Sequence, residues 1–191
     1  MRNQLGLAAA VVGLTSCQPS PEELTSKFTN RPDVFVQLRE MVTEDTGEKD
    51  CFAVGLDNIG DYRKLGDKWS DSRDFAKKLD LPQVLESARL SNARYDAYKK
   101  LFVESGSERV SLCRTGQFGP EVSVLVYRGG LSVSGCSGTI NWRGQTPLAF
   151  GPGGSLEMRD QTPDSYGKLG EGDFTEITPL SGGWYLEFSC T

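Results

Sequence analysis

Apolar residues recur along this chain at two different spacings, and the change between them constrains the fold more than any other sequence feature. In much of the first half they return every three or four positions, as Val34, Leu38 and Val42 do, which is the spacing of one helix face. From Val110 onward, apolar and polar residues alternate, most clearly in Val122–Tyr127, as expected for half-buried strands. We therefore expect a single α+β domain in which N-terminal helices pack on a C-terminal antiparallel β-sheet.

The helices have recognisable starts and ends. Ser20 followed by Pro21 and acidic residues predicts the start of a first helix, and we expect Asn30 to cap a second. A short helix is predicted over Phe75, Ala76 and Leu79. A longer one runs from Leu81 to a stop at Gly106, with a break near Ser91, and its Tyr95 and Tyr98 are expected to pack in the core.

The expected strands are separated by polar or glycine-rich segments. Residues 57–70 have no clean period and are predicted to be loop or irregular strand, and 151–155 and 160–173 are predicted to be loops. The turn Arg128-Gly129-Gly130 should form a hairpin in which Val124 lies opposite Gly135 and Val126 opposite Val133. Further strands are expected at Cys51–Leu56, Thr139–Arg143, around Leu156, and at Phe174–Thr178 and Trp184–Phe188.

The N-terminal stretch has the layout of a secretory signal. Arg2 precedes an apolar run, Leu5–Leu14, which is followed by small residues and is too short to span a bilayer as a helix. Leu14–Cys17, with the sequence Leu-Thr-Ser-Cys, also resembles the box of bacterial lipoproteins. The alternative is an ordinary cleaved signal.

The lipoprotein resemblance implies a layout for the whole chain. Residues 1–16 would be the signal peptide, Cys17 the acylated first residue carrying palmitate-type chains, 17–21 a lipidated tether and 22–191 the single domain. By resemblance to lipoprotein sorting patterns, Gln18 after the cysteine favours the outer membrane, with the domain facing the periplasm. The acyl anchor would hold the protein at the membrane, since several acyl chains bind stably.

The remaining four cysteines are even in number, which suits two disulfides in an oxidising compartment. Three pairings are possible. We prefer the pairing of Cys51 with Cys113 and of Cys136 with Cys190, because each pair joins two predicted strands without crossing the other. No metal site is expected, because the chain has no histidine and no Cys-x-x-Cys.

Composition argues against several functions. The net charge of −5, with acidic and basic residues interspersed, makes nucleic acid an unlikely partner. The absence of histidine removes Ser-His-Asp and Cys-His catalysis. Gly135-Cys136-Ser137 is similar to the nucleophile motif of L,D-transpeptidases without its histidine, and Glu104-Ser105 is similar to that of lytic transglycosylases without the downstream motif. We assign no catalytic residue and no cofactor.

The densest acidic set is expected to be a solvated face. Asp57, Asp61, Asp67, Asp71 and Asp74 are interleaved with basic residues that would neutralise a calcium site, and they lack EF-hand spacing.

Several longer motifs occur along the chain: Phe28 and Phe35 ahead of Leu38–Met41, then Arg94–Tyr98, Ser134–Trp142 and Gly183–Leu186. Together they resemble a group of small uncharacterised bacterial lipoproteins. Gly138 follows Ser137 where that group usually has a lysine, and the resemblance implies no activity.

We therefore expect an envelope lipoprotein that binds a protein partner and is not an enzyme. One specific form of this role is an immunity protein against a toxin in the periplasm. The alternatives are a peptidoglycan hydrolase, for which Glu104 is the candidate acid, and a structural lipoprotein of an envelope complex.

Overall fold

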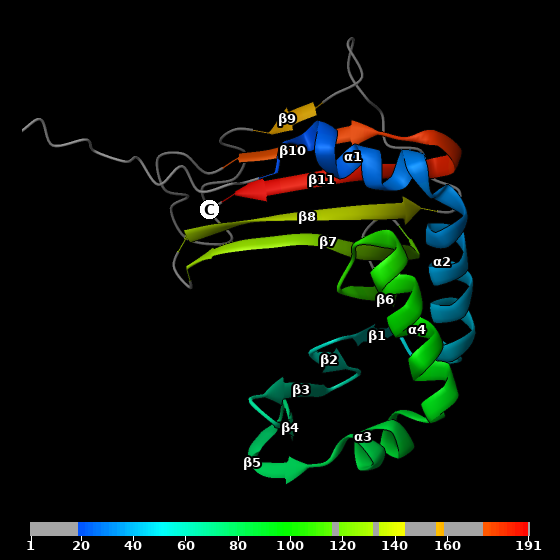
Figure 1. Ribbon diagram of the computed structural model, residues 1–191, viewed down its shortest axis with the longest axis vertical. Helices are drawn as coiled ribbons and strands as arrows, with labels where there is room; N and C mark the ends of the chain where they lie inside the picture. Colours follow the sequence, from blue (N-terminus) through cyan, green and yellow to red (C-terminus); the bar gives the residue numbers. More distant parts are fainter. Residues whose placement is uncertain (1–18, 116–118, 132–133, 144–155, 159–173, 191) are drawn as a thin grey trace, which may run out of the picture.

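A computed structural model gives the fold and describes residues 19–115, 119–131, 134–143, 156–158 and 174–190 (Figure 1). The expected signal peptide 1–16, Cys17, the position of Val133 in the hairpin, and the loops at 151–155 and 160–173 lie outside these residues.

Four α-helices are described, and their caps explain most of their bounds. Ser20 and Glu23 form a reciprocal capping box at the start of the first helix, and Gly106 ends the last in the left-handed region at φ 61°. Asn30 does not cap the second helix. It is the last residue of the first, and Arg31 takes the cap position without a side-chain hydrogen bond. The helices are α1 (Pro21–Asn30), α2 (Pro32–Thr46), α3 (Leu81–Ala88) and α4 (Asn92–Ser105).

The described strands form one antiparallel sheet of eleven, which confirms the α+β class. Their order is β5-β4-β3-β2-β1-β6-β7-β8-β11-β10-β9. The bounds are β1 (Cys51–Gly55), β2 (Asn58–Ile59), β3 (Tyr62–Leu65), β4 (Lys68–Asp71), β5 (Asp74–Leu79), β6 (Arg109–Cys113), β7 (Glu121–Leu131), β8 (Ser134–Arg143), β9 (Leu156–Met158), β10 (Phe174–Pro179) and β11 (Trp184–Cys190). Five strands thus precede α3, so the sheet starts earlier in the chain than expected.

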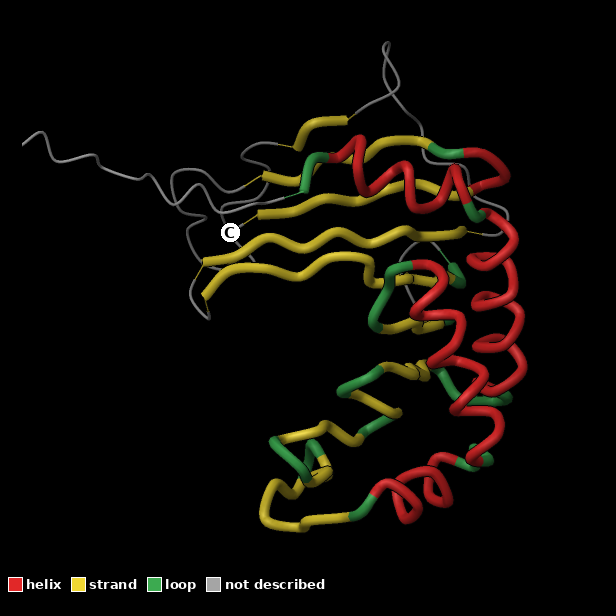
Figure 2. The backbone as a smooth tube through the Cα atoms, in the orientation of Figure 1, coloured by secondary structure: helices red, strands yellow, loops and turns green. Residues whose placement is uncertain are grey.

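The sheet bends along the long axis of the molecule. Strands β7, β8, β11, β10 and β9 lie at one end, β2 to β5 at the other, and β1 and β6 between them (Figure 1). Helices α2 and α4 run along one side and connect the two ends (Figure 2).

The core lies between the helices and one face of the sheet. Neighbouring strands place Val54, Val110, Val124, Ile140 and Leu186 opposite one another in a row, and each is at most 1% exposed. Helices α1, α2 and α4 contact strands of this row. Because side chains alternate along a strand, the residues between them point to the opposite face, which carries the polar groups described below.

A polar cluster around Asp45 joins α2 to α4. Its Oδ2 accepts hydrogen bonds from the Tyr98 hydroxyl at 2.7 Å and from Nε of Arg94 at 2.9 Å, and Arg94 also donates to Glu44 at 2.7 Å. Burial, reinforced by Asp45, raises the pKa of Tyr98 far above its ordinary value. Tyr98 is 0% and Tyr95 5% exposed, so the prediction that both tyrosines pack in the core is confirmed.

The prediction for residues 57–79 is wrong in part. The segment expected to be a helix over Phe75–Leu79 is strand β5, which is the wrong part. Residues 57–70, expected to be loop or irregular strand, contain the short strands β2, β3 and β4. The residues of β5 are exposed except for Leu79, which is half-buried, so no apolar stripe holds a helix against the core. Pairing with β4, including Trp69 opposite Leu79, decides the conformation instead.

The β7–β8 hairpin is longer than expected. Gly129 and Gly130 belong to β7, which continues to Leu131, so they do not form the turn. Val124 therefore pairs with Ile140 and not with Gly135. Gly135 lies opposite Gly130, where a Cβ would come within 2.6 Å of the Gly129 carbonyl oxygen. This backbone contact accounts for the glycine.

Candidate functional site

Both disulfides connect residues that face each other on neighbouring strands. Cys51 on β1 is joined to Cys113 on β6, and Cys136 on β8 to Cys190 on β11. This is the preferred pairing of the three that the sequence allowed. Cys136 therefore belongs to a disulfide in this structure.

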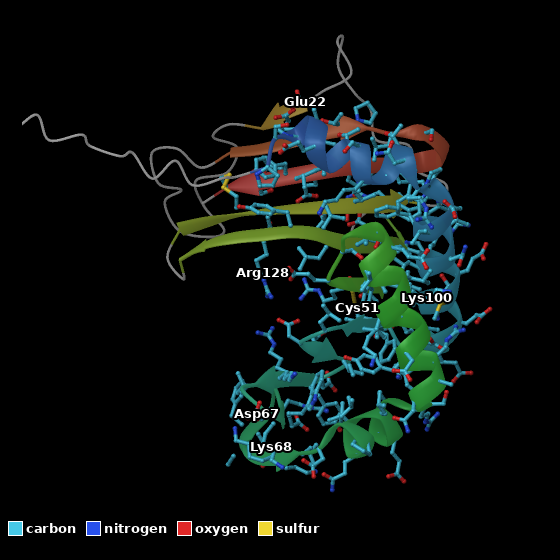
Figure 3. All side chains as sticks on the ribbon, in the orientation of Figure 1. Glu22, Cys51, Asp67, Lys68, Lys100 and Arg128 are labelled. Atoms are coloured by element: carbon cyan, nitrogen blue, oxygen red, sulfur yellow. A yellow bond between two sulfur atoms is a disulfide. The ribbon has the colours of Figure 1, made fainter. Side chains whose placement is uncertain are left out.

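The acidic residues of 57–74 are largely paired with basic ones. Asp61 and Asp71 bind Arg73 with distances of 2.7 and 3.5 Å, and Asp57 binds Arg128 of β7 at 2.9 Å. Figure 3 shows Arg128 reaching from β7 toward the β2–β5 end. Within the described residues, no group of three or more Asp, Glu, Cys or His is placed to hold a metal ion.

Glu104, the carboxylate considered for hydrolysis, forms ion pairs. Its Oε2 lies 2.7 Å from Arg31, at the junction of α1 and α2, and its Oε1 lies 4.0 Å from Lys100. These contacts tie the end of α4 to the first two helices, which is a structural role.

A different carboxylate cluster lies on the sheet face that points away from the core row. Glu121 of β7 binds Nε of Arg143 on the neighbouring strand β8 and accepts a hydrogen bond from the Tyr185 hydroxyl at 2.9 Å. Tyr185 is 3% exposed, and burial together with Glu121 raises its pKa well above the ordinary value. Glu121 therefore accepts hydrogen bonds from two donors on neighbouring strands.

Glu187 of β11 has a different environment in the same cluster. Burial, and secondarily the charge of Glu121, raise the pKa of Glu187, while Arg143 opposes the shift. Nδ2 of Asn141 lies 3.5 Å from the Glu187 carboxylate, and Asn141 itself is 1% exposed. A carboxyl group whose pKa is raised by burial and by a second carboxylate is a feature also found in acid–base sites.

The Glu187 environment predicts a pH effect on stability. A folded-state pKa above the unfolded value means that the folded protein binds more protons in the window between the two. Wild-type stability should therefore fall as the pH rises from about 4.5, the ordinary pKa, through the raised folded value. Glu187→Gln should remove this loss and be more stable than wild type at pH 7, by on the order of 1 kcal/mol, but not at pH 4.

Urea unfolding at both pH values measures this difference. Glu40→Gln, on α2 with a side chain 62% exposed, controls for the loss of one negative charge without burial. If Glu187→Gln raised the free energy of unfolding equally at pH 4 and pH 7, burial of the Glu187 carboxyl would not be the cause.

A cleft of about 310 Å³ opens beside the Cys51–Cys113 disulfide. Strands β1, β3 and β6, the turn after β2 and helix α3 all contribute to its walls, at the middle of the long axis, where Figure 3 labels Cys51. Its size is at the lower end of the range for ligand pockets. Its lining includes Lys49, Phe52, Tyr62, Arg73 and Ser111.

Lys49 is the cation of this cleft that has no ion pair within the described residues. Its ammonium nitrogen lies 3.9 Å from the centre of the Phe52 ring. Partial burial and then the charge of Arg89 lower the pKa of Lys49, and the charges of Asp45 and Asp61 oppose this shift. Arg73, the other cation in the lining, is already paired with Asp61.

Comparison with protein-family models, curated proteins and solved structures finds no match to this chain. The described helices include none long and apolar enough to cross a membrane.

Sequence reasoning found the cysteines of this site but missed the other residues. Lys49, Tyr62 and Ser111 are far apart in the chain and come together only because β1 pairs with both β2 and β6. The alternating pattern of Trp184–Phe188 did place Glu187 on the face opposite the core, but nothing in the sequence paired it with Asn141.

Proposed function

We propose that this protein is a lipid-anchored envelope lipoprotein that acts as a binding module, with the cleft beside Cys51–Cys113 as its recognition site. The cleft is the observation that carries the binding role, because it combines an aromatic wall with a cation that forms no ion pair within the described residues. The two disulfides support an oxidising compartment.

The start of the fold fits an anchor at Cys17. The capping box of α1 forms at Ser20, only three residues further along the chain, a span of about 10 Å when extended. Acylation at Cys17 would therefore hold α1 close to the membrane surface. Glu22 on α1 and Lys68 on β4 lie at opposite ends of the long axis, so the β3–β5 end would point away from the membrane (Figure 3).

An immunity protein is the specific form of this role that we favour, with the outer membrane as its location. A domain presented at a fixed height above the membrane can intercept a toxin entering the periplasm. A structural lipoprotein would share the anchor, and it would differ in that its deletion perturbs the envelope in the absence of any toxin.

Membrane fractionation tests the anchor. Cys17→Ser should move the protein from the membrane fraction to the soluble fraction after a carbonate wash, because the acyl chains are its proposed attachment. Its unfolding curve should match that of the wild-type protein. Retention of Cys17→Ser in the washed membrane would contradict the proposal.

A peptidoglycan hydrolase is the second candidate, and the raised pKa of Glu187 beside Glu121 favours it over a site at Glu104. In that case the purified protein should release muropeptides from peptidoglycan. Glu187→Gln should abolish the release and Glu104→Gln should not. Absence of release by the wild-type protein would end this candidate.

A further inference from the structure

The cleft beside the Cys51–Cys113 disulfide has a defined chemical preference. The Lys49 ammonium supplies positive charge and forms no ion pair within the described residues, and the charges of Asp45 and Asp61 only partly offset it. Tyr62 and Ser111 line the cleft, and their hydroxyls make no hydrogen bond to the described part of the chain. Three donor groups thus border one space.

Apolar groups border the same space. Phe52, which is 4% exposed, and Ala88, which is 6% exposed, line the cleft together with Ala53 and the disulfide. A ligand that places an anionic oxygen at Lys49 can therefore bury an apolar group against this wall. Asp61 also lines the cleft, and its charge is offset by Arg73, which lies 2.7 Å from it.

We infer that the cleft binds a carboxylate carried on an aromatic or other apolar group. Lys49 would contact the carboxylate, Tyr62 and Ser111 would donate hydrogen bonds to it, and the Phe52 side would hold the apolar part. This inference rests on the binding role proposed above and names its ligand chemistry. Such a carboxylate can come from a free acid or from the C-terminal residue of a partner protein.

The partial burial of Lys49 supports this assignment. A lysine that is desolvated and repelled by Arg89 gains more from an incoming anion than a fully hydrated one.

Isothermal titration of the purified full chain in mild detergent tests the inference. 3-Phenylpropionate should bind saturably. Its neutral amide, which lacks the negative charge, and acetate, which lacks the aromatic group, should each bind at least tenfold more weakly. Lys49→Met should weaken binding about tenfold, the effect of losing one charge-assisted contact. Ser111→Leu, which fills the cleft without changing its charge, should weaken it as well.

A control variant tests whether the effect is specific to Lys49, and a peptide probe distinguishes the two possible sources of the carboxylate. Lys100→Met, on α4 with a side chain 78% exposed, should bind as the wild type does. The peptide Gly-Gly-Phe with a free C-terminus should bind more tightly than its amide if a protein terminus is the source, and 3-phenylpropionate alone should bind if the source is a free acid. Equal binding by wild type and Lys49→Met, or no saturable binding by either probe, would overturn the inference. Neither result bears on the anchor, which fractionation of Cys17→Ser tests separately.

Discussion

The double variant Cys136→Ser, Cys190→Ser, which lacks the Cys136–Cys190 disulfide, should have a free energy of unfolding about 4 kcal/mol lower than the wild type. The disulfide closes a loop with a sequence separation of 54, and in the chain-entropy model a cross-link of this size restricts the unfolded chain by that amount. It also joins β8 to β11, at the end of the sheet that α1 covers. Guanidinium unfolding under oxidising conditions measures the loss.

The second disulfide provides a matched comparison. Cys51–Cys113 has a sequence separation of 62, so its removal should cost nearly the same, about 4 kcal/mol. Cys17→Ser, which removes a cysteine outside both disulfides, should leave the unfolding midpoint unchanged. A loss below 1 kcal/mol for both double variants would mean that these bonds do not stabilise the fold.

The second large effect is expected at Asp45, between α2 and α4. Asp45→Ala should lower stability by about 2–3 kcal/mol, because it leaves the Tyr98 hydroxyl, in a residue that is 0% exposed, and one side of Arg94 without their acceptor. Tyr98→Phe should cost less, about 1 kcal/mol, since it removes the donor and its need for an acceptor together.

Urea unfolding and a double-mutant cycle check this assignment. Asp45→Ala combined with Tyr98→Phe should cost less than the sum of the single changes, because both remove the same hydrogen bond. Asp96→Ala is the control, since its partner Lys99 and its own side chain are exposed, and it should change stability by less than about 0.5 kcal/mol. Strict additivity of Asp45→Ala and Tyr98→Phe would contradict the coupling.

Features set by neighbours in the chain could be predicted well. The α1 start at Ser20, the α4 end at Gly106 and the break at Ser91 depend on local capping, and all three occur in the structure. Val122–Tyr127 and Trp184–Phe188 were likewise expected to be strands and lie in β7 and β11, although burial does not alternate strictly, since Trp184, Tyr185 and Leu186 are all buried.

Features that depend on pairing with distant strands could not be predicted from the sequence. Asp74–Leu79 carries too few apolar residues to reveal its conformation, and it becomes a strand because β4 lies beside it. The register of β7 on β8 shifts between Leu125 and Tyr127, and no turn motif at Gly129 records this irregularity. The cleft depends on the same long-range pairing, since Lys49 and Ser111 meet across β1 and β6.

The central claim is that an acyl chain at Cys17 holds this domain at the membrane. Mass spectrometry of the protein extracted from washed membranes tests it most directly. We expect the mature chain to begin at Cys17. After digestion with trypsin, the lipid adduct should lie on the N-terminal peptide, which ends at Lys27. A chain that begins elsewhere, or an unmodified Cys17 in the membrane-bound protein, would contradict it.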